Sequence, residues 1–573
     1  MNAEHLLAHY EKITDAPDAI ARLRRFILDL AVRGKLVPQN ASDEPASELL
    51  RRIAAEKARL VKAGEIRKEK PLPEIENDEI PFDAPRGWEW GRIRKITSDR
   101  GQRVPDQDFT YIDVTAINKE VGRIEDARVI SAAEAPSRAR KIVRKGDVLY
   151  SCVRPYLLNI AIVETDISPP PIASTAFAIL NGFGLVLPRY QWIVLRSTFF
   201  VASVEEKMRG QAYPAVNDSD FSLLPIPLPP LAEQHRIVAK VDELMALCDR
   251  LEAARAEREA VRDRLAAASL ARLNAPDPDT YPNDIRFALD ALPALSTRPD
   301  QIKQLRQTIL NLAVRGKLVS QDPKDEPASQ LLKRIADKKE QLVRAGVIPR
   351  QKEITRDKSR LAEGLPRQWT PIALGEACNL VTSGSRGWAE FYADSGPGFV
   401  RSQNIRFGKL KLDDLAFVNP PSNSEGSRTQ VTKGDLLIVI TGAGVTNPAL
   451  LDHDLGEAYV SQHVGLVRPT DKKLSDWFLL CLMAPAGGRA ELVERAYGAG
   501  KPGLNLDNIR SLSIPLPPVV EQHRIVAKVD ALMALCDRLE SGLAAAATTR
   551  RRLLDALLAE ALEPTEHELE AAE

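Results

Sequence analysis

The sequence has little cysteine, no excess of charge of either sign and no long apolar run. Its 5 cysteines among 573 residues include no C-x-x-C pair, so they do not predict a zinc or redox site of that kind. Lysine and arginine (79) balance aspartate and glutamate (79), so net charge does not by itself support nucleic-acid binding. No run reaches the about 18 apolar residues of a membrane span, and the N-terminus shows no signal-peptide core. We therefore expect a cytoplasmic protein without a membrane partner.

About twenty residues occur twice, nearly letter for letter. The first copy consists of residues 226–230, two free positions and residues 233–242, and it continues to Glu252. In the second copy Glu521 repeats Glu233 at an offset of 521 − 233 = 288 residues. This offset far exceeds the period of about 20–50 residues that marks solenoid repeats, so the chain is a duplicated half-molecule.

Each copy predicts a proline-rich lead followed by a long helix. The lead is not helical, because each proline removes a donor and restricts the preceding residue. From Glu233 onward apolar residues follow at alternating spacings of four and three, which is the seam of a coiled coil. The seam residues are Ile237, Val241, Leu244, Cys248 and Leu251, and Ile525, Val529, Leu532, Cys536 and Leu539. Two helices of roughly 40 residues, each about 60 Å long, are predicted to pack as an antiparallel pair.

A second duplicated block precedes each globular part of the chain. Residues 31–47 recur at 313–329, an offset of 313 − 31 = 282 residues, with the shared run Ala-Val-Arg-Gly-Lys-Leu-Val. The apolar spacing predicts a helix over residues 20–32 with Gly34 as its C-terminal cap. A further helix is predicted after Pro45 and its repeat.

The composition changes after Trp88 and after Trp369. Short β-branched runs separated by Gly, Pro, Asn and Asp replace the helical pattern and predict strands of a mixed α/β domain. The predicted strands are 111–114, 146–150, 160–163, 399–400 and 434–440. A Lys-Gly-Asp turn recurs at Lys145 and Lys433, so both parts are predicted to share one fold although most residues between the shared motifs differ.

Nearly identical helical blocks beside divergent globular blocks predict one scaffold with two different recognition surfaces. The first half divides into a helical region (1–84), a globular domain (85–225) and a long helix with its linker (226–299). The second half divides into the repeated helical region (300–365), the second globular domain (366–513) and the C-terminal long helix (514–573).

Two unlike globular domains, each followed by I-P-L-P-P-x-x-E-Q-x-x-I-V and a long helix, resemble the specificity subunit of Type I restriction–modification systems. The resemblance covers essentially the whole chain. It implies an α+β fold with a pseudo-twofold internal repeat. Two α/β target recognition domains, separated by long repeated helices that form an antiparallel coiled coil, would each read one half of a bipartite, asymmetric site in double-stranded DNA.

The resemblance also implies which partners carry the chemistry. Two DNA methyltransferase (M) subunits would dock on the paired helices, and restriction (R) endonuclease-translocase subunits would join that core. S-adenosylmethionine, ATP and Mg are expected only in these partners, so this chain has no cofactor of its own. It is expected to be a non-catalytic subunit.

Two short motifs resemble enzyme sites but lack a required residue. Residues 419–422 are similar to the amino-methyltransferase motif Asn/Asp-Pro-Pro-aromatic, yet Ser422 replaces the aromatic residue that stacks on a flipped base. Residues 498–501 are similar to a phosphate-binding loop, yet Arg495 and Pro502 stand where that motif needs its first glycine and its Ser/Thr. Neither motif predicts catalysis by this chain.

Loop residues with basic, amide, hydroxyl or aromatic side chains are the candidates for DNA contact, because such groups reach base edges and phosphates. A basic stretch at 138–145 predicts a phosphate clamp, and residues 441–444 add a glycine-rich loop. The candidates in the first domain are Arg103, Arg138, Arg140, Lys141, Arg154, Tyr156, Gln211 and Tyr213. Those in the second domain are Ser385, Arg386, Trp388, Arg401, Gln403, Asn404, Arg406 and Lys501.

The duplicated Glu-Gln-His-Arg motif is predicted to cap its helix and to bind partner subunits. The residues concerned are Glu233, Gln234, His235, Glu521, Gln522 and His523. A metal site is not predicted, because no second ligand recurs at ligand spacing. The alternative function is a coiled-coil protein-interaction adaptor without DNA binding, which the neutral charge favours and the shared fold around divergent loops disfavours.

Overall fold

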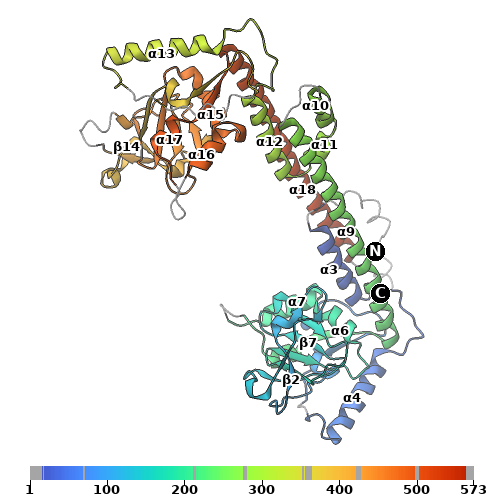
Figure 1. Ribbon diagram of the computed structural model, residues 1–573. Coiled ribbons are helices and arrows are strands. Elements are labelled where there is room, and N and C mark those ends of the chain that lie inside the picture. The colour runs from blue at the N-terminus through green and yellow to red at the C-terminus, as the bar shows by residue number, and fades with distance from the viewer. Residues whose placement is uncertain are drawn as a thin grey trace. The chain divides into compact units, whose positions relative to one another are not determined.

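The computed structural model describes residues 16, 18–68, 71–210, 214–274, 280–350, 354, 364–420, 428–496 and 503–562. They form two compact units (Figure 1): unit 1 comprises Met1–Arg258 with Ala547–Glu573, and unit 2 comprises Glu259–Ala546. In these residues no helix combines the length and apolar character that crossing a membrane requires.

The helices of unit 1 surround or follow a mixed α/β domain. They are α3 (Ala19–Val32), α4 (Ala46–Lys62), α5 (Ile93–Ile96), α6 (Pro188–Leu195), α7 (Thr198–Lys207), α8 (Asp218–Leu223), the first part of α9 (Leu231–Asn274) and the end of α18 (Val519–Leu562). The strands are β1 (Glu89–Arg92), β2 (Phe109–Ile112), β3 (Ile117–Asn118), β4 (Arg123–Ile124), β5 (Arg128–Ile130), β6 (Ala139–Ile142), β7 (Val148–Ser151), β8 (Ile160–Ile162), β9 (Pro171–Ser174), β10 (Phe177–Leu180) and β11 (Pro225–Leu228).

Unit 2 repeats this plan. Its helices are the end of α9, α10 (Tyr281–Asp290), α11 (Leu292–Leu295), α12 (Pro299–Val314), α13 (Ala328–Arg344), α15 (Ser475–Met483), α16 (Ala490–Arg495), α17 (Leu506–Arg510) and most of α18 (Val519–Leu562). The strands are β12 (Thr370–Ala373), β13 (Cys378–Ser383), β14 (Tyr392–Val400), β15 (Ile405–Arg406), β16 (Lys409–Leu410), β17 (Ala416–Val418), β18 (Leu436–Val439), β19 (Pro448–Leu450), β20 (Ala458–Val460), β21 (Val464–Pro469) and β22 (Ser513–Leu516).

The sheets of the two units have matching topology. In unit 1, β7 lies between β10 and β8, and β2 pairs parallel with β9 and antiparallel with β5. In unit 2, β18 lies between β21 and β19, and β14 pairs parallel with β20 and antiparallel with β17. The predicted common fold of the two globular domains is therefore confirmed.

The proline-rich lead of each long helix forms a strand of a two-stranded sheet. Among the described strands, β11 pairs only with β1, and Pro227 lies opposite Trp90. In the same set, β22 pairs only with β12, and Pro515 lies opposite Pro371. A strand with one neighbour tolerates proline, because the missing N–H lies on the side without a partner strand.

Both long helices are 44 residues long, which confirms the predicted length of roughly 40. The first turns of each seam pack inside the unit where the helix begins. Ile237, Val241 and Cys248 are buried in one core with Ile27 and Leu28 of α3. Ile525, Val529 and Cys536 are buried with Ile309 and Leu310 of α12 in the same way. The antiparallel coiled coil beyond these turns stays a prediction.

Helices α3 and α12 end in the same capped turn, as the glycine after each run predicts. Gly34 has a φ of +67°, and Lys35 N donates to Leu30 O at 2.9 Å. In unit 2 Gly316 has a φ of +66°, with the corresponding 2.9 Å bond from Lys317 N to Leu312 O. This is a Schellman cap, which satisfies carbonyls that the helix end leaves free. A Cβ on Gly34 would lie 2.3 Å from Pro85 Cγ, so close packing also requires glycine here.

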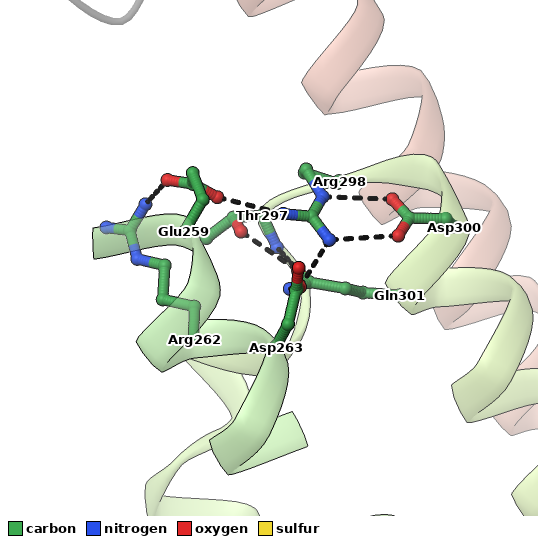
Figure 2. A network of polar contacts seen from close by, with 7 residues as sticks. All are labelled: Glu259, Arg262, Asp263, Thr297, Arg298, Asp300 and Gln301. Carbon is green, nitrogen blue, oxygen red and sulfur yellow. Dashed lines mark hydrogen bonds and ion pairs between the residues drawn. The ribbon is translucent and has the colours of Figure 1, made fainter. Parts of the chain in front are cut away.

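Arg298 holds the start of α12 against the end of α9 within unit 2 (Figure 2). Its guanidinium forms ion pairs with Glu259 at 3.0 Å, with Asp300 at 3.0 Å and with Asp263. Gln301, only 1% exposed, accepts from Thr297 at the same corner. The two acids of α9 are one helical turn apart, so one arginine reaches both.

Candidate nucleic-acid interface

The Glu-Gln-His-Arg motif forms an internal joint between each long helix and its domain. The Glu233 carboxylate accepts from Trp88 Nε1 at 2.9 Å and from Gln39 Nε2 at 2.7 Å. The Glu521 carboxylate accepts from Trp369 Nε1 at 2.9 Å and from Gln321 Nε2 at 2.6 Å. Burial raises the pKa of both carboxyls, while these hydrogen bonds oppose the rise.

These contacts correct the prediction that the motif binds partner subunits. Glu233, Gln234 and Glu521 are at most 1% exposed, so none of these three presents a side chain to another protein. Gln522 is also 1% exposed, but it lines a cavity. A carboxylate with two donors inside the chain satisfies a buried charge, which explains why the motif recurs unchanged. Only His235 and His523 are exposed, and partner contact by these two stays a prediction.

The Lys-Gly-Asp turn fixes the start of strand β7, which is followed by the β7–β8 loop. Asp147 is fully buried, and its Oδ2 accepts from Arg144 N at 2.8 Å and from Arg100 Nε at 2.6 Å. Burial raises the pKa of Asp147, and Arg100 opposes the rise. In unit 2 the buried Asp435 accepts from Thr432 N at 2.8 Å and pairs with Arg468 at 2.6 Å. The same turn therefore starts β7 and β18.

The next segment is the β7–β8 loop (residues 152–159) in unit 1 and the β18–β19 loop (residues 440–447) in unit 2. The two loops share two left-handed positions and one bridge, but their residues differ. Arg154 and Leu158 have φ values of 48° and 55° in the first loop, and Gly442 and Thr446 have 89° and 74° in the second. A bridge to Ala215 holds Val153, and a bridge to Gly503 holds Thr441. The bridge and the two left-handed positions form a common backbone frame, although Gly444, with a φ of 81°, is left-handed where Tyr156 is not. This frame presents two different sets of side chains.

The β7–β8 loop exposes side chains that suit contact with nucleic acid. Tyr156 is 43% exposed, Leu157 38% and Val153 37%, while Arg154 is partly buried in the left-handed region. That region costs a non-glycine residue about 1–2 kcal/mol. An observed left-handed arginine beside exposed apolar residues favours a functional loop over a structural one.

Basic side chains adjoin this loop across the turn that joins β9 to β10. Ala176 O in the turn accepts from Cys152 N at 2.8 Å, and Thr175 N donates to Arg138 O at 2.8 Å. Arg103 N in turn donates to Arg140 O at 2.9 Å. Arg103, Arg138 and Thr175 are exposed and Arg140 is partly buried. The predicted basic stretch and the loop are therefore parts of one surface in unit 1.

Lys141 does not belong to that surface, and the prediction that it contacts DNA is wrong. It is 3% exposed, and its Nζ lies 2.8 Å from Asp99 and 2.9 Å from Asp218. Burial disfavours its charged form, but these two carboxylates raise its pKa overall. An ammonium with two carboxylate partners inside the domain is structural.

In unit 2 three segments bring polar groups together beside the β18–β19 loop. Gly384 N donates to Val464 O at 3.1 Å, and Ser385 bridges Ser461. Ile440 N donates to His463 O at 2.9 Å, and Thr441 Oγ1 lies 2.6 Å from His463 Nδ1. Arg386, Gln462 and His463 present exposed polar side chains on this surface.

Three candidates of the second domain are buried, which corrects their assignment as DNA contacts. Ser385 is 2% exposed and lies 2.7 Å from Thr429 Oγ1. Trp388 is 3% exposed and stacks on Phe399 with ring centroids 5.8 Å apart. Asn404 is fully buried and donates to Asp414 at 3.0 Å. Their partners are not neighbours in the sequence, so the local residue pattern does not show that these side chains are buried.

The remaining candidates have mixed environments. Arg401 is partly buried and donates to Asp414 O at 2.8 Å, and the exposed Gln403 donates to Asp414 Oδ2 at 2.9 Å. Arg406 is exposed. Gln211, Tyr213 and Lys501 lie outside the described residues. No group of three or more His, Cys, Asp or Glu residues able to hold a metal occurs in the part of the chain that the structure describes.

Sequence reasoning missed Thr175, Gln462 and His463. They occupy the turns between β9 and β10 and between β20 and β21, and neither of the strands that follow these turns, β10 and β21, was predicted from the sequence. Their one sequence signal is a short polar interruption between apolar runs, and that pattern is typical of any turn.

The duplicated scaffold carries two α/β domains of one fold with unlike loops. This is the architecture of a protein with two different recognition surfaces. Comparison with known proteins gives the family. A model described as the Type I restriction modification DNA specificity domain matches residues 186–258 and 420–548. The chain is 32% identical to the Type I restriction enzyme EcoAI specificity subunit of Escherichia coli, with 94% of this chain and 93% of that protein covered. It is 33% identical to the EcoEI specificity subunit of Escherichia coli, over 95% and 94%.

The chain therefore belongs to the specificity subunits of Type I restriction–modification enzymes. A chain from a solved structure on complex assembly and conformational transition of the type I R-M system is similar, with a TM-score of 0.52, 25% identity, and 84% of this chain and 99% of that chain covered. Specificity subunits are non-catalytic, so the chain is not an enzyme. The comparisons do not support the adaptor.

Proposed function

We propose that the chain reads a bipartite, asymmetric DNA sequence, one half with each α/β domain, and holds that DNA for partner subunits. The observation that carries the proposal is one backbone frame with two side-chain sets: the β7–β8 loop presents Arg154 and Tyr156, and the β18–β19 loop presents Thr441 beside His463. Different side chains on one frame select different base edges, so the two half-sites differ.

The partners are two DNA methyltransferase subunits and restriction endonuclease-translocase subunits, which supply S-adenosylmethionine, ATP and Mg. The relatives are named as subunits of restriction enzymes, and the similar solved chain comes from work on complex assembly. The balanced charge of this chain fits a reader whose partners supply most of the phosphate attraction. We place the assembly in the cytoplasm. We also propose that the six segments defined in the sequence analysis are the domains of this chain.

In the first domain the proposed contacts are Arg103, Arg138, Arg140, Arg154 and Tyr156, together with Thr175. In the second they are Arg386, Arg401, Gln403 and Arg406, together with Gln462 and His463. Gln211, Tyr213 and Lys501 keep their sequence-based assignment. Arginine and the amide side chains can bond two base-edge atoms at once, which gives each good pair about 1–3 kcal/mol of discrimination.

The test is to co-express the full chain with a methyltransferase subunit of its own system and map methylated adenines by long-read sequencing. Wild type is expected to give one motif with two unlike halves around a fixed gap. Arg386→Ala should relax one half, and Arg103→Ala should relax the other, because each residue lies in one domain. Asp337→Ala, an exposed change on α13, serves as the control. A palindromic motif, or relaxation of both halves by one variant, would refute the proposal.

A further inference from the structure

One cavity of unit 2 lies where its long helix meets α15. It has a volume of about 180 Å³, enough for several water molecules at roughly 30 Å³ each. Asp476 and Trp477 of α15 line it, together with Asp530, Gln522 and His523 of α18. Asp476, Asp530 and His523 are exposed, and Gln522 and Trp477 are each 1% exposed. The two acids therefore form an open rim, with buried side chains below them.

Gln522 contributes a buried acceptor without a partner. Its Nε2 donates to Pro517 O at 2.8 Å, but its Oε1 has no hydrogen-bond partner among the described residues. A buried acceptor left unpaired costs about 1–3 kcal/mol. A donor entering the cavity would remove that cost.

Unit 1 shows how the equivalent acceptor is satisfied. Gln234 Oε1 accepts from Leu187 N, the residue before α6, at 2.9 Å. In unit 2 the residue before α15 is Leu474, whose N–H donates instead to Asp471 O at 3.1 Å within the 3-10 turn Lys472–Leu474. That extra turn uses the donor that Gln522 lacks.

Unit 1 also shows an arginine in the equivalent place. Tyr190 OH donates to Pro227 O and Trp477 Nε1 donates to Pro515 O, so Arg189 and Asp476 occupy the same position, one residue earlier. Arg189 forms an ion pair at 2.8 Å with Asp242, the counterpart of Asp530. Its guanidinium also lies 4.2 Å from the centre of the Trp192 ring.

Unit 2 therefore lacks the cation and has a second acid in its place. Burial and the charge of Asp476 both raise the pKa of Asp530, as expected for two carboxylates that share a site. Lys473 and His523 line the cavity as well, but neither forms an ion pair with Asp476 or Asp530 in the described part of the chain. Two carboxylates and one unpaired carbonyl oxygen together call for a donor with several N–H groups and a positive charge.

We infer that this cavity receives a cationic side chain, arginine or lysine, of the methyltransferase subunit that docks on unit 2. The inference rests on the proposed function and names one contact of that partner. The ammonium or guanidinium lies between Asp476 and Asp530 and donates to Gln522 Oε1. Unit 1 offers no such acceptor, because Arg189 already fills the equivalent place, so the two docking contacts of the protein differ chemically.

The experiment titrates the methyltransferase subunit onto the full chain without DNA and follows the one-to-one and two-to-one complexes by native mass spectrometry. Asp476→Arg places in unit 2 the arginine that unit 1 has. It should weaken binding of one methyltransferase copy by at least about tenfold, because an interfacial charge pair becomes a like-charge contact. Asp530→Asn removes one acceptor charge without adding volume and should weaken the same copy to a smaller extent.

Asp413→Arg makes the same change of charge at an exposed position away from the cavity and should bind both copies as wild type does. Thermal unfolding checks that each variant folds. If Asp476→Arg does not fold, binding of the methyltransferase by Asp530→Asn tests the inference. Wild-type affinity of both cavity variants for two copies would mean that the cavity holds water only, and would overturn the inference while leaving the proposed function intact. Loss of both copies in Asp476→Arg would also overturn it. A wild-type chain that binds no methyltransferase would refute the proposed function itself.

Discussion

In unit 1 the joint between long helix and domain consists of Glu233, Trp88 and Gln39, with hydrogen bonds of 2.9 and 2.7 Å. The joint of unit 2 repeats these residue types with bonds of 2.9 and 2.6 Å. The β7–β8 and β18–β19 loops share a bridge and two left-handed positions, yet at equivalent positions they have no residue in common except the asparagine that ends each of them. A buried polar group tolerates few alternatives because each partner must be replaced at once, whereas an exposed loop needs only its backbone frame.

The two units contain residues at equivalent positions. Changing first one residue of such a pair and then the other tests how far the two units are equivalent. The largest effect is expected at the joint. Trp88 and Trp369 are each 6% exposed and donate to the glutamate of the motif. Trp88→Ala should destabilise unit 1 and Trp369→Ala unit 2, each by about 3–5 kcal/mol, because a large cavity opens and a buried carboxylate loses a donor.

Hydrogen exchange with mass spectrometry measures this for each unit separately. Amides of the altered unit should lose protection, while those of the other unit keep it. Phenylalanine at the same position is the matched control, because it restores most of the volume but not the N–H. Equal loss of protection in both units after one substitution would show that the two units do not unfold separately.

A smaller effect is expected where the twins carry different residues. Asp29 in α3 is 6% exposed and accepts from Thr198 N at 2.8 Å; Asn311 in α12 accepts from Ala486 N at 2.7 Å and also donates to Asn274 Oδ1 at 2.7 Å. Asn274 is held in that orientation by its own bond to Leu270 O. Asn311→Asp therefore brings two acceptors together and should cost unit 2 about 1–3 kcal/mol at neutral pH.

The same pair predicts a pH dependence of stability at this position in unit 1 but not in unit 2, because Asn311 does not titrate. Burial raises the pKa of Asp29 above its ordinary value, although the Thr198 N–H opposes the rise. A raised folded-state pKa gives stability that is fully present below the unfolded pKa and is lost as pH rises through the folded pKa. Wild-type unit 1 should thus gain stability over Asp29→Asn as pH falls from 7 toward 4. Urea unfolding of both proteins across that range measures the difference, and parallel curves would contradict it.

Local features of the fold could be predicted from the sequence because their causes are local. The glycine caps of α3 and α12, the long helices and the strands after each Lys-Gly-Asp turn all depend on residues within a few positions. Strand β14 begins at Tyr392, well before the predicted 399, because pairing with β17 extends it through residues of weak strand propensity.

The candidate site was predicted less well, because exposure depends on contacts between residues that are not neighbours in the sequence. Arg103, Arg386 and Tyr156 are exposed as a DNA contact requires, but Lys141 and Asn404 are buried by Asp218 and Asp414 respectively. The sequence does not show whether the partner of a basic or amide residue is a phosphate or a carboxylate inside the protein. Only the fold distinguishes the two.

The smallest effect on stability is expected at Arg154. A left-handed backbone costs this arginine more free energy than it costs the glycine at the same position of the other loop. The φ of Arg154, 48°, lies in the left-handed region, and the equivalent residue of the other unit is Gly442, with a φ of 89° that glycine adopts freely. Arg154→Gly relieves about 1–2 kcal/mol of left-handed strain and loses part of that gain to the greater freedom of glycine in the unfolded chain. Unit 1 should thus become more stable by about 0.5–1 kcal/mol while recognition of its half-site weakens.

Arg154→Lys, which keeps the charge and the strain, is the control. It should leave stability unchanged and still lose selectivity, because an ammonium does not reproduce the planar fork of a guanidinium. Denaturant midpoints and the methylation motif, measured on the same three proteins, separate the two effects. If Arg154→Gly lost stability and kept the motif, the arginine would belong to the frame of the loop, and the contrast between the β7–β8 and β18–β19 loops would be structural.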